Sequence, residues 1–275
     1  MQASEVHVPR DLASLFNLMR RNPQALLLAG GTGILREQGQ RSLDFPPVII
    51  AIHDISELCR LVLTERFLEI GACVTLSDLA AYNPGTIQPA LLNAVKGIST
   101  VPIRNLATIG GNIACSSRFM DLWPVLACLD SLVEIRNPEG AKWININRFS
   151  DESGSPSLPS GAVITRIRIP LERWDVNIVV KMGQHDYPSP ETSVLCATAR
   201  TGKGIVNDFH LVMAGEHSFR SRELESAIVG RRLPLPENEI KLLSDEYRKQ
   251  YKLKNEVSGT GIGRLPELAL KTLAR

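Results

Sequence analysis

Aromatic residues are scarce in this chain of 275 residues, and neither positive nor negative charge is in clear excess. Phe, Trp and Tyr together make up 5% of the sequence, and 31 Lys and Arg face 29 Asp and Glu, which gives a formal net charge of +2. Proteins that bind nucleic acid usually carry a basic surplus, and many stack bases on aromatic side chains. The composition therefore argues against a nucleic-acid partner.

Cysteines and histidines at paired spacings are also missing. The five cysteines are an odd number and no two form a CxxC spacing, which argues against a disulfide framework, a zinc site or an iron–sulfur cluster on this chain. The five histidines form no HxH or HxxxH pair, so we predict no metal site. No GxSxG elbow marks a nucleophilic serine, and we assign no catalytic residue.

Long apolar runs are absent as well. No segment approaches the roughly 20 apolar residues that cross a bilayer. The opening residues, MQASEVHVPRDL, lack the apolar core of a signal peptide. We therefore expect a cytoplasmic protein with reduced thiols and without a membrane span.

Helical and strand patterns alternate along the first 170 residues. Apolar residues recur at helical spacing in 11–21, and short β-rich runs follow at 25–29 and 48–55. We predict that Ser77 caps a helix and that Pro124 lies in the first turn of another. Further strands are expected at 67–76, 131–137 and 162–170, and further helices at 87–98 and 120–130.

The last hundred residues have a different pattern. Three strands are expected at 176–182, 193–201 and 204–215, the last two joined by a turn at Gly202-Lys203-Gly204. Helices are expected at 221–230 and 236–253. A loop rich in Ser, Pro and Gly at 150–161 precedes this change. We predict an α+β fold, with one domain at 1–170, divided into about 1–54 and 55–170, and a second domain at 171–275.

Two stretches of small residues stand out, LAGGTGIL at 28–35 and ATIGGNIACSS at 107–117. A glycine-rich loop can turn several backbone N–H groups toward one point and so hold anionic oxygens. Neither stretch is a Walker loop, since no Gly-Lys-Ser/Thr follows, and neither has the GxGxxG spacing of a Rossmann fold. Each alone is a modest signal, but together they favour a site for the diphosphate of one cofactor.

These stretches also carry a family resemblance. LAGGTGIL, then LEIGACVTLSDL, then IRNLATIGGNIACSSRFMDLWPVLACLDSLVEI resemble the FAD-binding subunits of molybdenum hydroxylases, a family that includes xanthine dehydrogenase and aerobic carbon monoxide dehydrogenase. The resemblance implies an FAD-binding domain of the vanillyl-alcohol oxidase type at 1–170. It also implies a C-terminal three-stranded antiparallel sheet with helices.

The resemblance further implies a set of FAD-binding residues. The first stretch would wrap the diphosphate, and the second would contact the diphosphate and ribose. Asp121 would approach the adenosine part, Ile98 and the Ile164–Thr165 position would pack against the cofactor, and Lys181 would lie beside the flavin. The residues of the two stretches are Leu28, Ala29, Gly30, Gly31, Thr32, Gly33, Ile34 and Leu35, with Thr108, Ile109, Gly110, Gly111 and Asn112.

The sequence departs from the family in a few places. The family usually has Ser-Pro-x-x-Asp after the second stretch, where this chain has Arg118 and Met120 in a Ser-Arg-Phe-Met-Asp run. Arg118 either contacts phosphate or faces solvent. His185 stands where the family often has an arginine.

The resemblance implies an oxidoreductase subunit that transfers electrons through FAD. Molybdopterin would lie on a large partner chain and [2Fe–2S] clusters on a small one, with NAD or another compound as acceptor. One alternative is a stand-alone flavin oxidase or dehydrogenase of the same fold, for which we see no lid and no catalytic base. Another is a flavin-free scaffold protein, which the changes at Arg118 and Met120 leave open.

Overall fold

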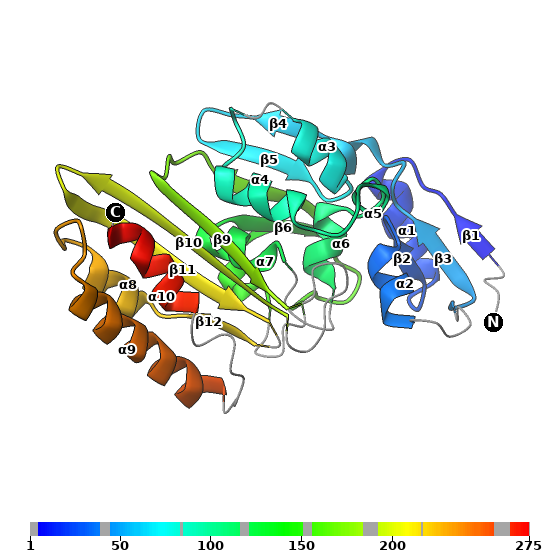
Figure 1. Cartoon of the computed structure of the whole chain (residues 1–275). Helices are drawn as coiled ribbons and strands as arrows, with labels where there is room; N and C mark the ends of the chain where they lie inside the picture. Colours follow the sequence, from blue (N-terminus) through cyan, green and yellow to red (C-terminus); the bar gives the residue numbers. More distant parts are fainter. Residues whose placement is uncertain are drawn as a thin grey trace.

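The computed structural model describes residues 5–38, 45–82, 85–115, 121–150, 156–183, 192–215, 217–255 and 265–274. The strands within these ranges form three sheets. Figure 1 shows the sheets following one another along the molecule, from the N-terminal end to a group of C-terminal helices. The predicted α+β class is confirmed.

The first sheet is small and parallel. It has the order β1 (Glu5–His7), β3 (Val48–Ala51), β2 (Leu26–Leu28). Helix α1 (Leu12–Arg21) connects β1 to β2, and Asp11 caps it by accepting a hydrogen bond from the Ser14 N–H at 2.7 Å. Helix α2 (Thr32–Gln38) follows β2 directly.

The second sheet is antiparallel and has five strands. Its order is β4 (Leu61–Leu63), β5 (Phe67–Gly71), β8 (Val163–Pro170), β6 (Leu132–Asn137), β7 (Gly140–Asn145). Helices that follow β5 in the chain share one hydrophobic core with this sheet. They are α3 (Leu76–Ala81), α4 (Pro89–Lys96), α6 (Ile109–Ala114) and α7 (Trp123–Cys128). The short helix α5 (Val101–Arg104) has no buried residue, and 3₁₀ helices lie at η1 (Ser56–Cys59) and η2 (Ile146–Arg148).

The third sheet is also antiparallel. Its order is β12 (Ser218–Arg220), β11 (Ile205–Ala214), β10 (Ser193–Gly202), β9 (Val176–Met182). Helix α4 packs against β9, and α7 packs against β10 and β11, so these two helices lie between the second and third sheets. The other face is covered by α8 (Arg222–Ile228), α9 (Glu237–Asn255) and α10 (Leu265–Lys271), with η4 (Thr272–Ala274) after them.

The structure adds elements that the sequence did not predict. The three expected C-terminal strands are present, and β12 adds a short fourth strand at the edge. Strands β1, β4 and β12 have three residues each, too few for an alternating pattern to be recognised. Strand β7 has no fully buried residue, and its two large apolar side chains, Trp143 and Ile144, are adjacent in the sequence, so it shows no alternating apolar pattern.

One predicted helix cap is wrong. The cap of α3 is Thr75, whose hydroxyl accepts a hydrogen bond from the Asp78 N–H at 3.0 Å, and Ser77 lies inside the helix. The reason is that β5 ends at Gly71 and the chain turns into the helix already at Leu76. Pro124 does lie in the first turn of α7.

The predicted division at 1–170 and 171–275 would place the first two sheets in one domain and the third in the other. It stays a prediction. Among the described residues, no helix combines the length and the apolar composition that a membrane crossing requires. In the same part of the chain, no three His, Cys, Asp or Glu side chains are placed to hold a metal ion together.

Candidate functional site

Both glycine-rich stretches lead into short helices rather than extended loops. After β2, Gly31 adopts a φ of +71°, a left-handed conformation that favours glycine, and α2 starts at Thr32. The first hydrogen bond of α2 runs from the Leu35 N–H to the Gly31 carbonyl oxygen at 3.1 Å. The N–H groups of the first turn therefore have no carbonyl to bond within the helix.

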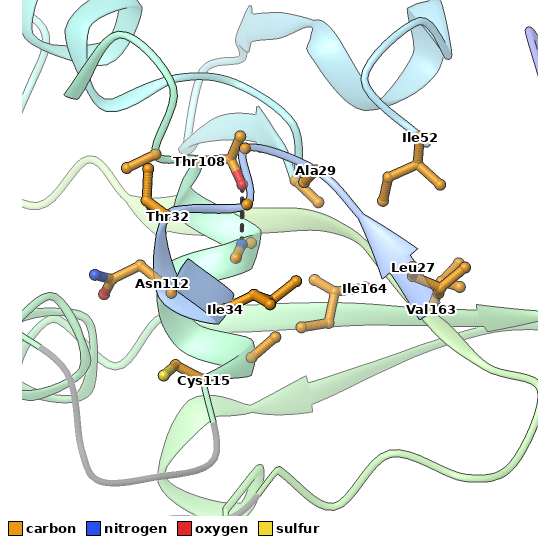
Figure 2. Close-up of a pocket in the computed structure, with 18 of the residues that line it drawn as sticks. Leu27, Ala29, Thr32, Ile34, Ile52, Thr108, Asn112, Cys115, Val163 and Ile164 are labelled. Carbon is orange, nitrogen blue, oxygen red and sulfur yellow. Dashed lines mark hydrogen bonds between the residues drawn. The ribbon is translucent and has the colours of Figure 1, made fainter. Parts of the chain in front are cut away.

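The second stretch begins α6 in a similar way. Thr108 caps the helix by accepting a hydrogen bond from the Gly111 N–H at 3.0 Å, the contact drawn as a dashed line in Figure 2. The expectation that ATIGGN at 107–112 forms a loop is corrected at this point, since Gly110, Gly111 and Asn112 lie in α6. A threonine cap with two following glycines places bare backbone at the start of this helix.

Two of the glycines allow close packing of backbone on backbone. A Cβ added to Gly30 would lie 1.7 Å from the Leu106 carbonyl oxygen, so the first stretch lies directly on the chain leading into α6. A Cβ added to Gly110 would lie 2.7 Å from both the Cβ and the carbonyl oxygen of Ala72, to which the Gly110 N–H donates at 2.9 Å. The glycines therefore bring α2, α6 and the end of β5 together.

A cavity of about 380 Å³ lies between these elements. Figure 2 shows Thr32 and Ile34 from the first stretch, Thr108 and Asn112 from the second, and Leu27, Val163 and Ile164 from strands β2 and β8 around it. Ten of the residues predicted to bind FAD line the cavity: Ala29, Gly30, Gly31, Thr32, Gly33, Ile34, Thr108, Gly110, Gly111 and Asn112.

Seven predicted residues are not among those that line the cavity: Leu28, Leu35, Ile98, Ile109, Asp121, Thr165 and Lys181. Ile98 and Ile109 are buried in the large core, and Leu35 is exposed. The Thr165 hydroxyl donates to the Glu134 carboxylate on the other side of β8, and its neighbour Ile164 lines the cavity instead. The roles of these seven residues stay predictions.

Two of these seven residues form an ion pair with each other. Lys181 Nζ on β9 lies 2.8 Å from Asp121 Oδ2, just before α7, and the two side chains are 10% and 12% exposed. The pair joins the third sheet to the segment that follows α6. Arg118, Met120 and His185, the departures from the family pattern, lie outside the described residues.

Several lining residues were missed by the sequence reasoning. Most are apolar residues that form a wall: Leu26, Leu27, Ile52, Ala72, Ala107, Ala114, Leu158, Ala162 and Val163, with Cys115 at the end of α6. They lie in β2, just after β3 and β5, around α6, and before and at the start of β8, and tertiary packing brings them together. Only their closeness to a glycine stretch in the chain could have indicated some of them.

The described residues that line the cavity are uncharged, and their polar and apolar groups can surround an anionic dinucleotide. Asn112 Oδ1 is buried and has no hydrogen-bond partner within the described part of the chain, so it can accept from a hydroxyl or amino group of a ligand. The first-turn N–H groups of α2 can donate to phosphate oxygens. The apolar wall can pack against a ring or a ribityl chain.

A charged cluster on β5, β6 and β8 supports this wall, and no local sequence pattern predicts it. Arg166 donates to Glu134 at 2.7 Å and to Glu69 at 2.9 Å, and Arg168 donates to Glu69 at 2.6 Å. Burial raises the pKa of Glu134, but the hydrogen bonds from Arg166 and Thr165 outweigh it and lower that pKa overall. The cluster fixes β8, whose Val163 and Ile164 line the cavity.

Comparison with known proteins connects this site to a family. A family model described as the FAD binding domain in molybdopterin dehydrogenase matches residues 2–172. The xanthine dehydrogenase FAD-binding subunit of Escherichia coli O157:H7 is 34% identical over 166 residues, which cover 60% of this chain and 56% of that subunit. The match thus spans little more than half the length of this relative.

Two solved structures share the fold of the whole chain. A chain of carbon monoxide dehydrogenase from Hydrogenophaga pseudoflava superimposes with a TM-score of 0.85 at 20% identity, covering 99% of this chain and 97% of that one. A chain of quinoline 2-oxidoreductase from Pseudomonas putida 86 gives 0.84 at 16% identity, covering 100% and 99%. At these identities the similarity establishes the fold, including the C-terminal sheet with its helices.

Proposed function

Because this chain belongs to the family of FAD binding domains in molybdopterin dehydrogenases, we propose that it is the FAD-binding electron-transfer subunit of a multi-subunit molybdenum hydroxylase. The observation that carries the proposal is the cavity between α2 and α6, which brings ten of the predicted FAD-binding residues together. The proposed complex resembles xanthine dehydrogenase.

The residues of this chain would hold the cofactor without charged side chains in the cavity itself. The first-turn N–H groups of α2 donate to the diphosphate, and Asn112 on α6 accepts from a hydroxyl or amino group. Bound FAD supplies the redox chemistry, which is the acceptance and release of electrons. The apolar wall at Ile52, Val163 and Ile164 excludes water from the part of the cofactor that it covers.

Lys181 has an electrostatic role in this proposal. Its ammonium group is largely buried and pairs with Asp121, whose carboxylate offsets much of its charge. Its effect on the flavin therefore requires that the ammonium group lie nearer to the flavin than the carboxylate does. A lysine beside the flavin favours added negative charge and so raises the tendency of the cofactor to accept electrons. The proposal places the pair toward the flavin end of the cofactor, and so moves Asp121 away from the adenosine part, where the family resemblance placed it.

The partner chains are proposed from the family to which this chain belongs. A large chain would carry molybdopterin and oxidise the substrate, a small chain would carry [2Fe–2S] clusters, and NAD or another acceptor would take electrons from the flavin. Co-expression of this chain with candidate large and small chains, followed by purification of an intact complex, tests this part. A chain that binds FAD and oxidises a small molecule alone would favour a stand-alone oxidase.

The cofactor itself is tested on the purified full chain and on one blocked variant. We expect flavin absorption bands and release of FAD on denaturation. Gly33→Leu should fold but bind no FAD, because Gly33 lines the cavity and a Cβ there has only Cys115 Sγ within 4 Å, at 3.9 Å. A colourless wild-type chain that takes up no added FAD would overturn the proposal and favour a flavin-free scaffold.

A further inference from the structure

The cavity has one chemical deficit for the ligand that we propose. The described residues that line it include no charged side chain. The diphosphate of a dinucleotide carries two negative charges, and helix starts and amide groups supply only partial positive charge. A full positive charge near the cavity would balance the negative charge of the diphosphate better.

Arg36 on α2 is placed to supply that charge. It lies three residues after Gly33 and four after Thr32, so it shares a helix face with two residues that line the cavity. Its Nη2 donates a hydrogen bond to Cys115 Sγ at 3.0 Å. Because Cys115 lines the cavity from the end of α6, the guanidinium group of Arg36 lies at the rim, between the two helices.

Gly33 leaves room for a ligand beside Cys115, the residue to which Arg36 donates. Gly33 has no side chain, and a Cβ there would have only Cys115 Sγ within 4 Å. An anionic group can therefore approach the Gly33 backbone, the first-turn N–H groups of α2 and Arg36 from the same side. A guanidinium group matches this task because its planar N–H donors pair with phosphate oxygens at fixed angles.

We propose that Arg36 is the cationic contact for the diphosphate of the bound dinucleotide, and that Cys115 positions its guanidinium group. This inference rests on the proposed function, since it assumes that the cavity holds FAD. A purely structural alternative is that Arg36 only ties α2 to α6 through Cys115.

The test measures the Kd for FAD of the full chain by quenching of flavin fluorescence at low and high salt. The variants are Arg36→Gln, Arg36→Lys and, as a matched control, Arg20→Gln, which removes an exposed arginine from the last turn of α1. Arg36→Gln should raise the Kd roughly tenfold at low salt, as expected for loss of one charged hydrogen-bonding contact. That factor should shrink as salt rises from about 0.02 M to about 0.5 M, and Arg36→Lys should recover much of the affinity.

The outcomes separate this inference from the function on which it rests. A wild-type chain without FAD affinity overturns the proposed function and this inference with it. If the wild type binds FAD but Arg36→Gln binds equally well, only the inference is overturned. A loss of FAD affinity that is the same at both salt concentrations and is not recovered by Arg36→Lys would show that Arg36 only ties α2 to α6. A lower thermal unfolding midpoint without FAD for Arg36→Gln, but not for Arg20→Gln, would show the same.

Discussion

At the scale of single residues, Gly30 and Gly33 lie in the same stretch and lack side chains for different reasons. The Cβ position of Gly30 lies within 1.7 Å of the Leu106 carbonyl oxygen, a backbone atom that cannot move aside without shifting the entry to α6. The Cβ position of Gly33 is next to the cavity and, among the described residues, meets only Cys115 Sγ, at an ordinary contact distance of 3.9 Å. The first glycine therefore serves packing, and the second serves access to the cavity.

Alanine at each of these positions should separate the two roles. We expect Gly30→Ala to lower the free energy of unfolding by about 3 kcal/mol, because the new methyl group overpacks two backbone segments. Gly33→Ala should leave that free energy unchanged or raise it by up to about 1 kcal/mol, since alanine favours a helix and meets no clash. Urea unfolding of both variants measures the difference, and equal effects would contradict the assignment.

At the scale of elements, the five-stranded sheet depends on the buried carboxylate of Glu134. Its side chain is 2% exposed and receives hydrogen bonds from Arg166 and Thr165, which hold its pKa below the ordinary value of 4.5. Since the folded state binds a proton less readily than the unfolded state, this stabilisation is present above about pH 4.5. It is lost as the pH falls below that value.

Glu134→Gln tests this dependence. The variant should be less stable than the wild type by about 2–3 kcal/mol at pH 7, because Arg166 loses its charged partner. The difference should shrink as the pH falls below about 4.5, where the wild type takes up a proton at Glu134. Unfolding in urea between pH 7 and pH 3 checks the prediction, and a difference that is constant with pH would contradict it.

The elements also show what the sequence could and could not predict. Helix α1 and strands β8, β10 and β11 were predicted because each has a clear apolar period and at least eight residues. Helices α2 and α6 were read as loops because glycine is a poor helix former and both helices are short. The ten cavity residues were found from local glycine patterns and a family resemblance, whereas the apolar wall forms only when β2, β3, β5 and β8 come together.

At the scale of the whole molecule, α7 connects the second sheet to the third. Arg220 on β12 donates to the Ala127 carbonyl oxygen near the end of α7 and to Asp130 at 2.8 Å, and its Nε donates to Glu225 at 2.8 Å. The Arg220 side chain is 8% exposed. No local pattern in the sequence predicts this cluster, since its members lie up to about a hundred residues apart.

Arg220→Met should weaken the junction between these sheets. The side chain keeps its length, but Asp130 and Glu225 lose a buried cationic partner, so we expect the free energy of unfolding to fall by about 3–5 kcal/mol. Arg222→Met is the matched control, because Arg222 also pairs with Asp130 and Glu225 but is 58% exposed, and it should cost about 1 kcal/mol or less. Thermal unfolding of both variants measures this, and similar losses would contradict a special role for Arg220.

The central claim is that FAD lies in the cavity between α2 and α6, and a crystal structure of the full chain grown with FAD tests it most directly. We expect the diphosphate to contact the backbone at 30–34 and 108–112, with Asn112 Oδ1 accepting a hydrogen bond from the cofactor and Arg36 at the rim. Density for FAD elsewhere on the chain, with this cavity holding only water, would contradict the account.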